Sequence, residues 1–496
     1  MKRTPLHIAL VIAGVCVLGL AGCQDSGQET TRAEATPAPA EPAAAAPAPE
    51  LPRVAMIPRE DIFGNPERAQ GRVSPDGQSV SWIAPVDGVM NVWVAPVDDP
   101  TAARPITNDT YRGIRNHVWA PNSEYVYFLQ DKGGNENFQV YASNVEIGEV
   151  RSLTPQDEGV RSTIQGVSRS KADKILVGSN DRNGQVFDLY MVDTATGEKT
   201  LVKENPGYAA WMVDNDLEPR FGMVQVPGGG ANVVDFEGNV LYEIPAEDFL
   251  TTSAFGFDES NQFMYAVDSR GRDKAALVKI SAEDGSVEVI AEAKKADISN
   301  VILHPTTYEP LAYASNYLKN EWTPLNDETA ADLDFLRANL DGEFSVAGAT
   351  EDLGKVVVVN SSATAPGVYY LYDREAQTLE KMMSTRPVLD DAPLQPMHPV
   401  EVPSRDGMTL VSYLTLPAGS DKDGDGRPET PQPMVLWVHG GPWARDSYGY
   451  NSIHQWLANR GYAVLSVNYR GSTGVGKTVV NAAVRDFSGK MPDELI

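Results

Sequence analysis

The sequence predicts an all-β seven-bladed β-propeller followed by the first part of an α/β domain with a parallel sheet. Short strand-like runs recur with a period in the mid-forties between about residues 70 and 390, and from about residue 396 strands alternate with helices instead. The 496 residues exceed one ordinary domain, and 42% hydrophobic and 22% charged residues are typical of globular proteins. We therefore expect two folded domains, 53–395 and 396–496.

Residues 1–22 have the features of a lipoprotein signal peptide. Lys2 and Arg3 form a positive start, and the apolar run over residues 6–20 is too short to span a bilayer comfortably. The run ends in Leu-Ala-Gly before Cys23, which resembles a bacterial lipobox and makes Cys23 the predicted site of lipid attachment. An ordinary secretory signal that contains a cysteine is the alternative. Gln24, where an Asp would resemble an inner-membrane retention signal, favours an outer-membrane anchor facing the periplasm.

Residues 23–52 predict a tether between this anchor and the first domain. They are rich in Ala and Pro and contain no aromatic residue, so they favour an extended spacer over a packed core. Cys16 and Cys23 are the only cysteines, which excludes an internal disulfide and a cysteine-based metal site after cleavage. The formal net charge of −27 would repel a phosphate backbone and argues against nucleic acid as a partner.

Seven similar runs rich in β-branched and aromatic residues predict the propeller. Polar turns and a second strand follow most of them, as in a four-stranded blade repeated around an axis. The sixth unit departs, because residues 317–342 delay its second strand and their middle predicts a helix. We expect this insertion to form a loop at one rim. The runs occupy residues 77–84, 123–130, 172–180, 220–226, 261–268, 309–316 and 354–362.

The last hundred residues predict the beginning of a doubly wound sheet. Strands at 398–403 and 408–417 should form an antiparallel pair. The nearly all-apolar run at 433–441 predicts a strand covered on both faces, and a helix at 451–460, a strand at 462–468 and a helix starting at 476 follow it.

A glycine-rich turn, HGGPW at 439–443, closes the apolar strand. Glycines at the carboxyl end of a central strand let backbone N–H groups point into a crevice where ligands bind. A tight strand-to-loop turn with no function is the alternative for this motif by itself.

Together with the repeats, the segments HGGPWARDSYGYN (439–451), VLSVNYRGSTGVGK (464–477) and VNAAVRDFSGKMPDELI (480–496) resemble the prolyl oligopeptidase family of serine peptidases, in its acylaminoacyl-peptidase and dipeptidyl-peptidase branch. The resemblance implies an α/β-hydrolase domain capped by the propeller, with peptide substrates reaching an active site between the two. It also implies that Gly440 and Gly441 form part of an oxyanion hole, with the Gly441 amide as donor. Other branches carry a Tyr at the position of His439, so His439 should not be a catalytic base.

The family's Ser, Asp and His triad is missing from these residues. No G-x-S-x-G elbow exists in the 496 residues, and none of the six histidines follows such an elbow. We therefore expect the triad beyond Ile496, and expect this chain to be an inactive fragment of a lipid-anchored enzyme that cleaves oligopeptides through an acyl-enzyme. Two alternatives stay open: a non-catalytic envelope lipoprotein whose propeller binds partners, and an esterase or other acyl hydrolase.

One acidic loop suggests a calcium site. Asp421, Asp423 and Asp425 stand at alternate positions, and Gly426 permits the sharp turn of an EF-hand-type loop. The pattern departs at its twelfth position, where Gln432 replaces the bidentate Glu. An acidic surface turn is the alternative, and no other cofactor is expected.

Overall fold

The computed structural model describes residues 54–155 and 159–495. The predicted signal peptide, the lipid-attachment residue Cys23 and the whole of the predicted tether lie outside these residues. Among the helices in the described part of the chain, none is long and apolar enough to cross a membrane.

Seven antiparallel sheets follow one another along the first domain, and hydrogen bonds join the strands of each in chain order. The first three sheets contain β1 (Ala69–Val73), β2 (Ser79–Val86), β3 (Val89–Pro96), β4 (Arg104–Pro105), β5 (His117–Trp119), β6 (Tyr125–Gln130), β7 (Gln139–Asn144), β8 (Val150–Ser152), β9 (Ser162–Val167), β10 (Lys174–Ser179), β11 (Asp188–Asp193) and β12 (Lys199–Lys203). The next two contain β13 (Ala210–Val213), β14 (Pro219–Gln225), β15 (Ala231–Val234), β16 (Val240–Ile244), β17 (Ser253–Phe257), β18 (Phe263–Asp268), β19 (Ala276–Ser281) and β20 (Val287–Ala291). The last two contain β21 (Ile298–Leu303), β22 (Pro310–Asn316), β23 (Asn320–Pro324), β24 (Glu343–Ala349), β25 (Lys355–Ser362), β26 (Ala365–Asp373) and β27 (Thr378–Ser384).

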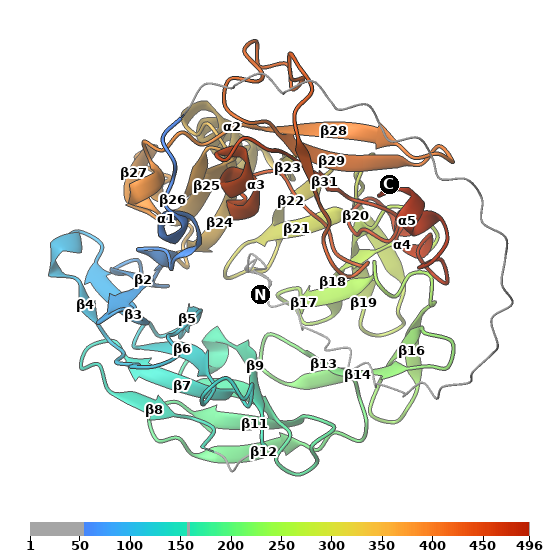
Figure 1. The fold of residues 1–496 in the computed structure, drawn as a ribbon. Coiled ribbons are helices and arrows are strands. Elements are labelled where there is room, and N and C mark those ends of the chain that lie inside the picture. The colour runs from blue at the N-terminus through green and yellow to red at the C-terminus, as the bar shows by residue number, and fades with distance from the viewer. Residues whose placement is uncertain (1–53, 156–158, 496) are drawn as a thin grey trace, which may run out of the picture.

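These sheets lie around a ring, which confirms the predicted propeller architecture (Figure 1). Each of the seven runs found in the sequence forms the second strand of one sheet. The ring closes through side chains, because Val80 and Trp82 of the first sheet pack against Val357 and Leu371 of the last. No strand is exchanged between these two sheets.

The sixth sheet corrects one prediction. Its second and third strands are adjacent, since β23 pairs with β22 directly, so residues 317–342 delay no strand. The predicted helix is present as α2 (Asp327–Asn339), which follows the three-stranded sheet instead of forming a rim loop. Leu333 and Leu336 of α2 pack with Trp322 and with Phe344 of the seventh sheet, because these apolar side chains are buried only between the two sheets.

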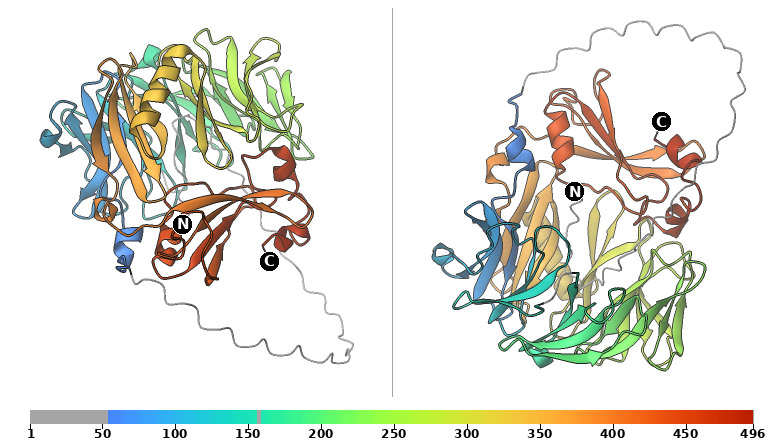
Figure 2. Two further views of the ribbon diagram at one scale, coloured as in Figure 1. Left: turned by 90° about the horizontal axis from the view of Figure 1, so that it is seen from above. Right: turned by 60° about the horizontal axis from the view of Figure 1, so that its bottom comes forward.

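The second domain, here called the C-terminal domain (residues 397–495), lies against one face of the ring (Figure 2). Its sheet has the order β28-β29-β31-β30, with β28 antiparallel to β29 and β30 parallel to β31. The predicted antiparallel pair is therefore confirmed. The elements are β28 (Met397–Pro403), β29 (Thr409–Thr415), β30 (Met434–Trp437), α3 (Ser452–Ala458), β31 (Ala463–Val467), α4 (Lys477–Asn481) and α5 (Lys490–Asp493).

Strand β30 departs from its predicted burial. It is an edge strand, and the side chains of Met434 and Trp437 are 55% and 40% exposed. The prediction of a strand covered on both faces is wrong for the described residues, because Met434 and Trp437 point to opposite faces of the sheet and both are exposed. In addition, none of the described strands pairs with the free edge of β30. An apolar edge strand of this kind is a surface that another strand can pair with.

The segment before the propeller packs on the C-terminal domain. Helix α1 (Arg59–Phe63) lies beside α3, and the rings of Phe63 and Trp456 meet edge to face at 5.7 Å. The Ile57 amide donates to Asn459 Oδ1 at 2.9 Å. Contacts of the segment before the propeller thus tie the start of the first domain to α3.

Candidate functional site

Two loops of the C-terminal domain meet because β30 and β31 run in parallel. Their register pairs Met434 with Ala463 and Trp437 with Ser466, so both strands end at the same edge of the sheet. The loop after β30 carries HGGPW, and the loop after β31 carries residues 468–476. In α/β sheets the crevice beyond the carboxyl ends of the strands is the usual place of a ligand site.

The glycine turn after β30 presents two free backbone donors. Gly440 and Gly441 are both exposed, and neither amide donates a hydrogen bond to any residue that the structure describes. Gly441 has φ of +148°, and a Cβ at this position would lie 2.6 Å from the Trp443 nitrogen. Only glycine fits this conformation, so the backbone itself fixes where the two N–H groups point.

His439 holds this turn against the second loop. Its Nε2 lies 2.9 Å from the Ser472 hydroxyl, and its ring stacks on Tyr469 with centroids 4.7 Å apart. The Tyr469 hydroxyl donates to the His439 carbonyl oxygen at 2.9 Å. Ser472 is fully buried, so no substrate can reach its oxygen. This Ser–His pair positions the loop and does not form a nucleophile and base.

Backbone bonds and a buried carboxyl complete the junction of the two loops. The Asp446 amide donates to Asn468 Oδ1 at 2.8 Å, and Asn468 Nδ2 donates back to the Asp446 carbonyl at 3.0 Å. Burial raises the pKa of the Asp446 carboxyl, and the neighbouring His439 opposes that shift. The Thr473 amide donates to the Ala444 carbonyl at 3.0 Å. The glycine turn therefore rests on a loop with little freedom to move.

His454, in α3, is a structural residue. It is fully buried, and its two ring nitrogens lie 2.9 Å from Thr415 Oγ1 and 2.8 Å from Ser466 Oγ. Burial lowers its pKa to about 4, so the ring is neutral at physiological pH. It ties α3 to β29 and β31 and does not face the glycine turn.

The propeller also contacts the second loop. Asp297 Oδ2 accepts from the Gly476 amide at 3.2 Å, and the Asp297 amide donates to the Gly474 carbonyl at 3.0 Å. Lys274 Nζ donates to the Val475 carbonyl at 2.6 Å. Burial raises the pKa of Asp297. No sequence pattern marks these partners, because they lie about 180 to 200 residues from the loop that they hold.

A buried ion pair strengthens the same interface. Lys477 Nζ, at the start of α4, lies 2.7 Å from Asp248 Oδ1 and 3.5 Å from Glu247 Oε1. The side chain of Asp248 is 2% exposed. On the other side, Arg445 Nη1 donates to the Asn316 carbonyl at 2.7 Å. The domain interface therefore holds both loops that form the candidate site.

The predicted calcium loop brings its carboxylates together. Single oxygens of Asp421, Asp423 and Asp425 lie within 4.8 Å of one another. Asp421 also accepts from the amides of Gly424 at 2.9 Å and Gly426 at 3.0 Å, which fold the loop. These contacts account for the loop as an acidic turn, and calcium binding stays a prediction.

Comparison with known proteins extends the similarity over most of the chain. The chain is 45% identical over 446 residues to "Dipeptidyl aminopeptidase BIII" of Pseudoxanthomonas mexicana. This alignment covers 89% of this chain and 65% of that protein. It is 32% identical over 481 residues to "Dipeptidyl peptidase family member 6" of Caenorhabditis elegans, which covers 89% of this chain and 64% of that protein. The chain thus spans slightly less than two thirds of the length of these two relatives.

The fold and one family model agree with this similarity. A solved puromycin-hydrolyzing peptidase of Mycobacterium tuberculosis superposes with a TM-score of 0.63 at 15% identity, over 90% of this chain and 72% of that one. The family model BD-FAE matches residues 425–490, which include the glycine turn. The predicted resemblance of this chain to the prolyl oligopeptidase family of serine peptidases is therefore confirmed.

Proposed function

We propose that this chain is the propeller and the first part of the catalytic domain of a serine peptidase that cleaves oligopeptides through an acyl-enzyme. The observation that carries the proposal is the pair of exposed, unbonded amides at Gly440 and Gly441, at the carboxyl edge of a parallel strand pair. The similarity to a dipeptidyl aminopeptidase over 89% of the chain supports the peptide as substrate class.

The two amides suit the charge that forms during acyl transfer. When a serine attacks a peptide carbonyl, the carbonyl oxygen becomes an oxyanion, and fixed N–H donors stabilise it without reorganising. The Gly441 amide would donate to this oxygen, together with an amide beside the nucleophile. In this proposal the contact between Ser472 and His439 helps to hold the turn in place. The nucleophile, the acid and the base come from residues outside this sequence.

The propeller would control access to that site. Its seven sheets are the seven blades of one closed propeller in this proposal, supported by the packing of the first sheet on the last. The C-terminal domain lies against one face of the ring (Figure 2). In this proposal the propeller admits peptides and unfolded chain ends to the site and excludes folded proteins.

Peptidase assays test the proposal directly. A longer protein that contains this sequence should hydrolyse a dipeptide p-nitroanilide, and a serine-directed phosphonate should abolish the turnover. Residues 1–496 alone should show none, because they contain no nucleophile elbow. Phosphonate-sensitive turnover by residues 1–496, or turnover of p-nitrophenyl esters without peptides by the longer protein, would contradict it.

Two further features belong to the same proposal. The protein would be anchored at the outer membrane by a lipidated Cys23, so C23A should move it from the membrane fraction to the soluble fraction.

The loop at Asp421, Asp423 and Asp425 would bind calcium weakly, which calorimetry with the D421N variant as control would detect. Identical titrations of the two proteins would remove the calcium site.

A further inference from the structure

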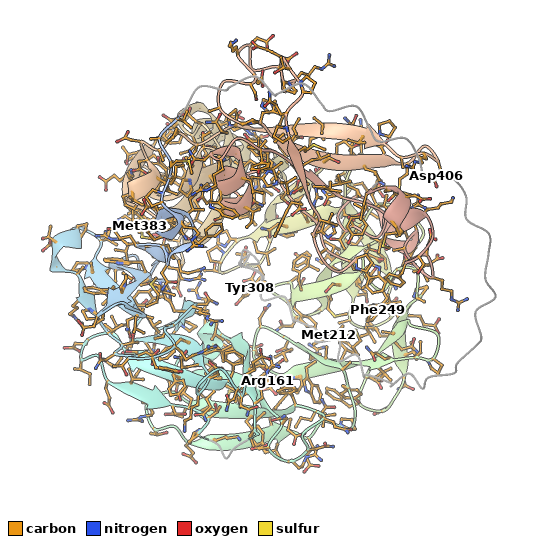
Figure 3. The ribbon with its side chains drawn as sticks, in the orientation of Figure 1. Arg161, Met212, Phe249, Tyr308, Met383 and Asp406 are labelled. Atoms are coloured by element: carbon orange, nitrogen blue, oxygen red, sulfur yellow. The ribbon has the colours of Figure 1, made fainter. Side chains whose placement is uncertain are left out.

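A largely apolar cavity lies along the propeller axis. It has a volume of about 500 Å³ and is lined by the first strand of every sheet of the ring. Each of these strands contributes an apolar side chain to the wall: Val73, Trp119, Val167, Val213, Phe257, Val301 and Val346. Figure 3 shows Tyr308, which follows the sixth of these strands, near the centre of the ring. The volume is sufficient for a small ligand.

One buried cation in this wall has no anionic partner. Arg72, in β1, is 8% exposed and lines the cavity. Its Nη1 donates to the Ala347 carbonyl and its Nη2 to Asn116 Oδ1, both at 3.2 Å, and its Nε has no partner among the described residues. No carboxylate of the described chain lies within ion-pair distance of this guanidinium. Burial lowers its pKa to about 10, so it remains charged at neutral pH.

The other charged side chains of the wall are paired. Arg374 Nη2 lies 2.6 Å from Asp332 Oδ2, and Arg220 Nη1 lies 3.2 Å from Asp214 Oδ2. Each cavity-lining carboxylate is thus neutralised by an arginine. The guanidinium of Arg72 is left with an uncompensated charge and with unused donors.

A carboxylate on the ligand would balance the charge of Arg72 and accept hydrogen bonds from its unused donors. A buried ion without a partner is costly, and a guanidinium is most strongly stabilised by two parallel bonds to a planar oxyanion. The rest of the wall would accept an apolar group. We propose that the propeller cavity binds a carboxylate carried on an apolar group, such as the C-terminus of a short apolar peptide, with Arg72 as its anchor. This site is separate from the glycine turn and does not depend on peptidase activity.

Calorimetry on the longer protein that contains this sequence tests whether the cavity binds the carboxylate of a ligand or only its apolar group. N-acetyl-leucine carries a carboxylate on an apolar body, and N-acetyl-leucinamide is its neutral counterpart. The acid should bind at least about tenfold more tightly than the amide, because a charge-assisted bond is stronger than a neutral one. Inorganic phosphate should compete poorly, since it leaves the apolar wall unfilled. Phosphate binding as tightly as the acid would assign the site to inorganic anions and overturn the apolar part of the proposal.

Variants test the position of the site. R72M should lose at least about tenfold in affinity for the acid while keeping any weak affinity for the amide. R169M is the matched control, because Arg169 is an exposed arginine paired with Glu351 that does not line the cavity. It should bind like the unaltered protein. Equal affinities for acid and amide, absence of binding, or an R72M protein that binds normally would overturn the proposal.

A second variant keeps the test valid if R72M fails to fold. Gly256 lines the cavity, and a Cβ at this position meets no atom within 4 Å. G256L would therefore place an apolar side chain in open space while Arg72 is kept, and should weaken binding of the acid with little change in melting temperature. A folded G256L protein with unchanged affinity would place the ligand elsewhere.

Discussion

Replacing Gly441 with alanine should disable the oxyanion donor while leaving most of the fold intact. An alanine Cβ would lie 2.6 Å from the Trp443 nitrogen, closer than such atoms approach, and φ of +148° is unfavourable for any side chain. The turn must therefore shift and move the Gly441 amide. Loss of one oxyanion donor lowers kcat by about 100- to 1000-fold, or about 2.7–4 kcal/mol.

The assay is steady-state kinetics of the longer protein on a dipeptide p-nitroanilide. The fall should appear in kcat with little change in KM, because the donor acts on the transition state. G461A is the matched control. Gly461 also has a positive φ, +89°, but it follows α3 and a Cβ there meets no atom within 4 Å. It should cost about 1 kcal/mol of stability and leave kcat unchanged. A G441A enzyme with normal kcat would refute the role of this turn.

Three further predictions concern stability, measured by urea unfolding. Burial lowers the pKa of His454 from 6.5 to about 4, so below pH 6.5 the unfolded state binds a proton that the folded state excludes. The free energy of unfolding should therefore fall by up to about 3 kcal/mol as the pH drops from 6.5 to 4, and H454Q should remove this part of the pH dependence. R470M should cost about 3–5 kcal/mol, because it removes the cationic partner of the buried Glu494, 2.7 Å from Arg470 Nε, and leaves it only the backbone amide of residue 470; a loss below about 1 kcal/mol would contradict this. K477M should cost about 3 kcal/mol by leaving the carboxylate of Asp248 buried without its cationic partner, and adding D248N in a double-mutant cycle should recover part of the loss. Strictly additive losses in stability would show that the pair does not couple the domains.

The propeller was predictable because each sheet contains one strand with a strong pattern. The second strands, such as β6 and β25, are apolar runs bounded by turn residues, and their period exposed the repeat. The first strands gave no comparable signal. β5 has three residues and β13 has four, which is too short for a period-2 pattern to stand out, although both strands contribute to the cavity wall. The cavity and Arg72, the arginine of its wall without an anionic partner among the described residues, were therefore missed.

The site was predictable only where it is local in sequence. The glycine turn follows an apolar strand, and the positive φ of residue 441 directly explains why a glycine stands there. The contacts that support it are not local. Ser472 and Asp297 lie 33 and 179 residues from their partners, His439 and Gly476, and no pattern marks them. The exposure of β30 was missed as well, since an apolar run is typical of a central strand and does not reveal which neighbours cover it.

The most direct measurement of the central claim is a crystal structure of the longer protein bearing a peptidyl phosphonate on its serine. The phosphonyl oxygen stands where the oxyanion of the reaction would be. The account predicts this oxygen at about 2.7–3.1 Å from the Gly441 nitrogen, with the His439–Ser472 contact unchanged. A phosphonyl oxygen that points away from the turn, or an adduct that forms with the Gly441 amide bonded elsewhere, would contradict it.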